Sequence, residues 1–167
     1  YQSSIGMGLK AIPQETYIKF ANRMFEERGK HIERTVTEKV YSMFAGYTWF
    51  VQMMMNELFA LTAHGEWCKT DKIETARKNV IQTQDSLYRE ILANLATKQK
   101  QVLQAIAKER EAQGITSSAF IKKYNLPSAS SVQAAVKGLI EKDLITQTDG
   151  VYRVYDYFFA DWLATEY

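Results

Sequence analysis

The stretch "LPSASSVQAAVKGLIEKDLITQTDGVYRVYD", residues 126–156, joins a helix pattern to a hairpin pattern and decides the fold. Ser128 suits the start of a helix, because a serine side chain can accept a hydrogen bond from a backbone N–H of the first turn. Asp149-Gly150 lies between two β-rich runs and strongly indicates a tight hairpin turn. Apolar residues at helical spacing predict one buried face, made of Val132, Ala135, Val136, Leu139 and Ile140.

Two further helix patterns precede this stretch and complete a known motif. One ends before Gly114, and the segment "TSSAFIKKYN" predicts a short helix capped by Thr116 or Ser117. The apolar positions of the first pattern are Leu95, Val102, Leu103 and Ile106. Helix, helix, turn, helix and β-hairpin in this order define a winged helix-turn-helix. We therefore predict that domain, with one β-hairpin wing, over residues 93–167.

The tail of the chain, "VYRVYDYFFADWLATEY", carries seven aromatic side chains in 17 residues. Aromatic rings can stack on nucleic-acid bases. However, Phe158, Phe159, Trp162 and Leu163 share one stripe of a helix, which favours packing. We therefore expect a C-terminal aromatic helix that packs back onto the winged helix.

Residues 1–92 are predicted to form a small four-helix bundle of the lid type, so the whole chain is mainly α. The third helix is apolar nearly all round, from Trp49 through Met53–Met55 to Leu61, and should be the buried centre of the bundle. The four helices are expected after Pro13 as far as Gly29 and at about 35–45, 48–62 and 71–92.

The charge is nearly balanced in both halves of the chain. Residues 1–92 carry 12 basic and 11 acidic side chains, residues 93–167 carry 9 and 8, and the net charge is +2. Proteins that bind nucleic acid through its phosphates normally bring a strong positive excess. The balance therefore favours protein contact over duplex DNA as the use of the winged helix.

The chain lacks a recognisable catalytic or metal-binding motif. Its one Gly-Lys pair, Gly29-Lys30, lacks the earlier glycine of a phosphate-binding loop. His64 and Cys68 are four residues apart, but a zinc site needs three or four ligands and no second pair exists. We expect no metal and no enzymatic activity of this chain alone.

The sequence has features of a cytoplasmic protein. Cys68 is the single cysteine, which suits a reducing compartment. Signal-peptide and membrane-spanning patterns are absent, so no membrane partner is expected. The chain starts without Met, and we expect it to be a C-terminal fragment of a longer protein.

Four quoted segments together point to one family. They are "LKAIPQETYIKFANRMFEERGKHI" (9–32), "GYTWFVQMMMNELF" (46–59), "LPSASSVQAAVKGLIEKDLI" (126–145) and "YRVYDYFFADWL" (152–163). The first two resemble the lid helical bundle, and the last two the winged helix and closing segment, of prokaryotic STAND-type AAA ATPases of the archaeal-ATPase-like group. The resemblance implies that residues 9–13 follow the last strand of a nucleotide domain.

The resemblance also implies a nucleotide contact. In that family a Gly-hydrophobic-Pro motif of the lid lies near the bound nucleotide, and here Gly46, Tyr47 and Thr48 match it, with threonine in place of proline. We expect Thr48 to cap the following helix. Tyr157 follows Asp156 where the family usually has proline. ATP and Mg are implied for the parent protein, likewise an N-terminal nucleotide-binding domain that is absent here; this fragment itself needs no cofactor.

Two functions remain open at this point. One is a C-terminal regulatory fragment of an ATP-binding AAA/STAND ATPase, which couples the missing nucleotide domain to a winged helix that contacts protein or nucleic acid. The alternative is a winged-helix DNA-binding transcriptional regulator with an N-terminal helical effector or dimerisation domain. Under both, the candidate contact residues are Lys122, Lys123, Ser128, Ser130, Ser131, Gln133, Lys137 and Arg153.

Overall fold

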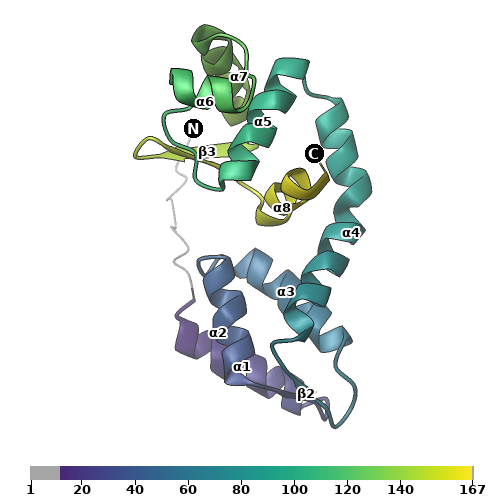
Figure 1. The fold of residues 1–167 in the computed structure, drawn as a ribbon. Coiled ribbons are helices and arrows are strands. Elements are labelled where there is room, and N and C mark those ends of the chain that lie inside the picture. Colours follow the sequence, from purple (N-terminus) through teal and green to yellow (C-terminus); the bar gives the residue numbers. More distant parts are fainter. Residues whose placement is uncertain (1–11, 167) are drawn as a thin grey trace, which may run out of the picture. The chain divides into compact units, whose positions relative to one another are not determined.

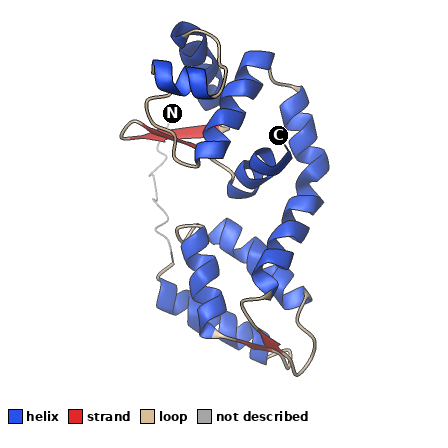
Figure 2. Cartoon of the chain, viewed as in Figure 1, coloured by secondary structure: helices blue, strands red, loops and turns tan. Residues whose placement is uncertain are grey.

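The computed structural model describes residues 12–166, which fold into two compact units that divide between Val80 and Ile81. Helices dominate both units (Figures 1 and 2). The division lies inside α4 (Lys72–Ala93) instead of at the predicted boundary after residue 92. The reason is that the second part of α4 packs in the second unit, where Tyr88 stacks on Phe159 with 4.8 Å between ring centroids. Most of the predicted transition at residues 9–13 lies outside the described residues.

The first unit contains the four predicted helices and one feature that the sequence did not predict. The helices are α1 (Gln14–Glu26), α2 (Arg34–Met43), α3 (Thr48–Ala60) and the first part of α4. The additional feature is a short parallel sheet of β1 (His31–Ile32) and β2 (Trp67–Cys68). The buried side chains that hold the helices together include Tyr17, Phe25, Val36, Val40, Phe44, Val51, Met54 and Leu58.

Helix α3 is buried on one face and is not the fully enclosed centre that its composition predicts. Phe50, Met54 and Leu58, spaced four residues apart, are buried. Trp49 has 71% of its surface exposed and Tyr47, just before the helix, 56%. The prediction was wrong because apolar residues around a helix allow burial on every side, whereas the neighbouring elements cover only one.

The second unit is a winged helix-turn-helix, as predicted. It comprises α5 (Thr97–Glu109), α6 (Ser118–Lys123), α7 (Ala129–Glu141), the hairpin of β3 (Ile145–Thr148) and β4 (Val151–Val154), and α8 (Tyr157–Glu166). Thr148 pairs with Val151 in the antiparallel register, and both turn residues between them have positive φ, as a type I′ turn requires. On the other edge of β4, Tyr152 bridges to Ala112.

Serine caps start both helices of the helix-turn-helix. The Ser117 hydroxyl accepts from the backbone N–H of Phe120 at 3.2 Å, and the Ser128 hydroxyl from that of Ser131 at 3.4 Å. The predicted buried stripe of α7 is confirmed for its first four members. Ile140 is the exception, with 37% of its surface exposed, because it lines a groove between α7 and the hairpin.

The C-terminal aromatic residues belong to the core, as predicted. Phe158, Phe159 and Trp162 are each at most 2% exposed. The Asp156 carboxylate caps α8, accepting from the N–H groups of Phe158 and Phe159 at 2.8 and 3.0 Å. Asp156 therefore performs the capping task directly, and Tyr157 occupies the first helical position, where the related pattern has proline.

Two buried threonines offer a matched test of hydrogen bonding in the core. The Thr37 hydroxyl has no hydrogen-bond partner among the described residues, whereas that of Thr62 donates to the Leu58 carbonyl at 2.7 Å. Replacing Thr37 with valine should raise the free energy of unfolding by about 1 kcal/mol, because it removes an unsatisfied buried group. Thr62→Val should lower it by roughly 1–3 kcal/mol. Urea unfolding measures both; equal effects would contradict the prediction.

The cap of α8 generates a pH-dependent prediction. Burial raises the pKa of Asp156, so its charged form disfavours folding and stability declines as pH rises from the ordinary aspartate pKa through the raised folded one. Asp156→Asn keeps the capping oxygen and should abolish this decline. Asp156→Ala should lose about 1 kcal/mol at every pH. Urea unfolding at pH 4.5 and 7 distinguishes them, and a decline that persists in Asp156→Asn would assign it to another group.

Candidate recognition surface of the winged helix

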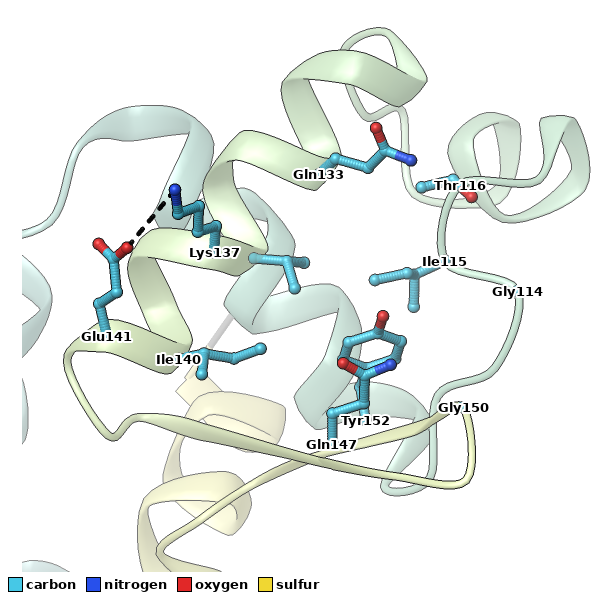
Figure 3. Close-up of a pocket in the computed structure, with 11 residues that line it drawn as sticks. Gly114, Ile115, Thr116, Gln133, Lys137, Ile140, Glu141, Gln147, Gly150 and Tyr152 are labelled. Atoms are coloured by element: carbon cyan, nitrogen blue, oxygen red, sulfur yellow. Dashed lines mark ion pairs between the residues drawn. The ribbon is translucent and has the colours of Figure 1, made fainter.

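A groove lies between α7, the hairpin and the loop that precedes α6 (Figure 3). Its volume is about 500 Å³. Ile115 from the loop, Val136 and Ile140 from α7, and the Tyr152 ring from β4 make its apolar lining. The α7 wall also carries Gln133, which the sequence predicts as a contact residue. The groove is thus built by the same elements that a winged helix uses for recognition.

One of the two α6 cations predicted to contact a partner, Lys123, is paired with a carboxylate of the same unit. Lys123 Nζ lies 2.5 Å from Glu109 Oε1 at the end of α5, and the Tyr124 hydroxyl donates to the same oxygen at 2.5 Å. The hydrogen bond from Lys123, with that from Tyr124, lowers the pKa of Glu109, and Glu109 in turn raises the pKa of Lys123. The neighbouring Lys122 is exposed.

The cations of the wing and of α7 also lie near carboxylates, Arg153 at hydrogen-bond distance and Lys137 in a longer, exposed pair. Arg153 donates from Nη2 and Nε to Glu111 Oε1 at 2.7 and 3.2 Å. Lys137 Nζ lies 3.9 Å from Glu141 Oε1 one helical turn further on, and both side chains are mostly exposed. Three of the four predicted cationic contacts therefore face a carboxylate of their own unit, and the local positive charge is offset.

The three candidate serines cluster at the start of α7. The Ser128 hydroxyl lies 3.0 Å from that of Ser130 and 3.2 Å from that of Ser131, and Lys98 Nζ donates to Ser131 at 3.2 Å. The structure thus joins these serines to α5. It does not gather all the candidates into one site, because Lys123 and Arg153 are held at separate carboxylates.

Several residues of this surface were not predicted from the sequence. Glu141 follows Lys137 by four residues, so a helical charge-pair rule could have linked them. The partners Glu109 and Glu111, and the groove residues Ile115, Gln147 and Tyr152, meet the candidates only through tertiary folding.

The predicted nucleotide contact forms a tight turn in the first unit. Ala45 and Gly46 both have positive φ, and a Cβ on Gly46 would lie 2.6 Å from the Tyr41 hydroxyl. Tyr47, not Thr48, occupies the capping position of α3, and no side chain caps the helix there. The predicted capping role of Thr48 is therefore wrong: it is the first helical residue, the position that also favours proline.

Within residues 12–166, no three histidine, cysteine or acidic side chains come close enough together to hold a metal ion. Cys68 is buried in β2, and burial raises the pKa of its thiol. None of the helices in the described part of the chain combines the length and apolar character needed to cross a bilayer.

Comparison with known proteins agrees with the fold. Residues 86–165 match a family model described as a probable winged helix domain. A solved structure, the Walker-type ATPase paby2304 of Pyrococcus abyssi, aligns with 92% of this chain at 19% identity and a TM-score of 0.65. This chain covers 42% of that protein's chain. At this identity the likeness concerns the fold. No curated protein matches the sequence.

The ion pairs lead to a test of the charge of the surface. In the triple variant Glu109→Gln, Glu111→Gln and Glu141→Gln, Lys123, Arg153 and Lys137 lose their carboxylates, and the variant should gain salt-sensitive affinity for duplex DNA. Fluorescence anisotropy with a labelled duplex at 50 and 200 mM salt measures this, and the unmodified chain should show little binding.

A control variant separates local charge from net charge. Glu26→Gln, Glu27→Gln and Glu38→Gln changes the net charge by the same amount, but these residues lie in the first unit. It should bind no better than the unmodified chain. Equal gains in the two triple variants would show that pairing on the winged helix is not what suppresses DNA binding.

Proposed function

We propose that this chain is the C-terminal regulatory part of an ATP-binding AAA/STAND-type ATPase, in which the winged helix contacts protein. A helical lid would respond to the nucleotide state of a preceding nucleotide-binding domain, and the winged helix would transmit that state through its contacts. Such coupling works when two arrangements of a protein differ in their affinity for the nucleotide. In this proposal ATP and Mg bind the parent protein, and the chain itself performs no catalysis.

A protein partner is favoured over DNA by the pairing of Lys123, Lys137 and Arg153 with carboxylates of the same unit. A protein that binds DNA releases counterions by placing free cations against phosphates. Here each of these cations would first have to leave a carboxylate, or would bring that carboxylate toward the phosphate backbone. A protein surface imposes no such charge requirement, since interface cores are depleted of charged residues.

The likeness to a Walker-type ATPase supports the first part of the proposal. It extends through 92% of this chain and therefore includes both units, while more than half of that protein has no counterpart here. Tyr47 is the candidate for the nucleotide contact, because it stands in the family's lid motif and 56% of its surface is exposed just before α3.

DNA recognition is the second candidate, and the exposure of α7 favours it. Ser130, Gln133 and Lys137 are exposed along this helix, and polar side chains of this kind can contact phosphates and base edges. Salt-sensitive duplex binding by the unmodified chain would select this alternative.

The ATPase assignment is tested on the complete polypeptide that contains this chain. Isothermal titration with Mg-ATP should show binding, and Tyr47→Ala should weaken it several-fold. Tyr155→Ala is a matched control, because Tyr155 is 55% exposed and Tyr47 56%. The control should bind as the unmodified protein does. Absence of ATP binding would overturn the assignment, and equal loss in both variants would overturn the role of Tyr47.

A further inference from the structure

The groove beside α7 has the physical character of a ligand-binding site. Figure 3 shows Ile140 from α7, Ile115 from the loop, and Tyr152 and Gln147 from the hairpin directed toward the same space. At about 500 Å³ it lies within the usual size range of such sites. Its exposed Ile140 is the part of the α7 stripe that the core leaves uncovered. An apolar side chain of a ligand could therefore remove this surface from water.

Polar groups without a protein partner surround the apolar lining. The side-chain amides of Gln133 and Gln147 and the hydroxyls of Thr116 and Tyr152 make no hydrogen bond to another residue of the described chain. They come from three different elements, α7, the hairpin and the loop. An amide offers both a donor and an acceptor, which is the complement of a peptide group. These groups are suited to hold a backbone beside a buried side chain.

The charges at the groove disfavour an ionic ligand. Its only two charged lining residues within the described chain are Lys137 and Glu141, which face each other. A phosphate or carboxylate ligand would compete with Glu141 for Lys137, and a cationic ligand would compete with Lys137 for Glu141. An uncharged ligand would compete for neither side chain and would leave the ion pair intact.

We propose that this groove binds an uncharged peptide segment of a partner protein, anchored by one large apolar side chain against Ile140, Ile115 and Tyr152. The proposal rests on the protein-contact function proposed above and names its site and the chemistry of its partner. Gln133 and Gln147 hold the peptide backbone on the two sides of the anchor. The Lys137–Glu141 pair stays intact at the rim.

A random-peptide phage library selected on the immobilised chain tests the proposal. Selection should enrich peptides without net charge that share one aromatic or large aliphatic position. Binding of a synthetic enriched peptide should weaken about tenfold in Ile140→Glu, as for loss of an apolar anchor. Tyr152→Phe keeps the ring and should weaken it several-fold by removing the hydroxyl alone.

Thr146→Glu is the matched control, because it adds the same charge at an exposed position on the opposite face of the hairpin. It should leave the peptide affinity unchanged. Circular dichroism of each variant verifies that the helices remain folded. Equal affinity of the peptide for Ile140→Glu and the unmodified chain would overturn the groove as the site while leaving the protein-contact function intact.

Other occupants give different results, and each would overturn the proposal. Failure to enrich any peptide, or enrichment of strongly charged ones, would show that the groove does not select an uncharged segment. Self-association in sedimentation velocity that Ile140→Glu abolishes would assign the groove to a second copy of this chain. Salt-sensitive duplex binding by the unmodified chain would count against the protein-contact function itself.

Discussion

The packing of the winged helix depends on α5. The Glu109 carboxylate at the end of that helix limits how much unpaired positive charge the domain presents. Val102, Leu103 and Ile106 of α5 are fully buried, and α7, α8 and β4 pack against this helix. Glu109 binds Lys123 and Tyr124 of the α6 segment in one place. Lys123 of α6 is therefore paired with a carboxylate of α5.

The same pairing of cations with carboxylates recurs elsewhere in the domain. Arg153 on the wing is held by Glu111, which directly precedes the residue that bridges to β4, and Lys137 is held by Glu141 on α7. Isolated exposed ion pairs contribute little to stability. Three of the four candidate cations, Lys123, Lys137 and Arg153, lie beside carboxylates of their own unit, and this lowers the local positive charge. The groove beside them offers apolar area and neutral polar groups, which suits a protein partner better.

The sequence predicted features that are encoded locally. Ser117 and Ser128 cap their helices because a hydroxyl reaches a backbone N–H two or three residues away, and Asp149-Gly150 forms the turn because both residues accept positive φ. The aromatic helix α8 was likewise predictable from its spacing. In each case the decisive interaction joins residues close together in the chain.

Features decided by tertiary packing were not predictable in this way. Nothing near Lys123 in the sequence identifies Glu109 as its partner, and the apolar composition of α3 does not reveal that Trp49 is left exposed. The parallel pairing of His31–Ile32 with Trp67–Cys68 joins segments too short to show a strand pattern. The groove also needed the structure, since its lining comes from three separate elements.

The ion pair between Lys123 and Glu109 decides whether the α6 cation is free to meet a ligand, and an NMR titration of the glutamate side-chain carboxyl carbons measures it. We predict that the pKa of Glu109 lies below the ordinary glutamate range and rises toward it in Lys123→Met, which keeps the aliphatic stem but removes the charge. An ordinary pKa that does not change in the variant would mean that Lys123 is free in solution. That result would contradict the claim that the cations of this winged helix are paired with carboxylates of the same domain.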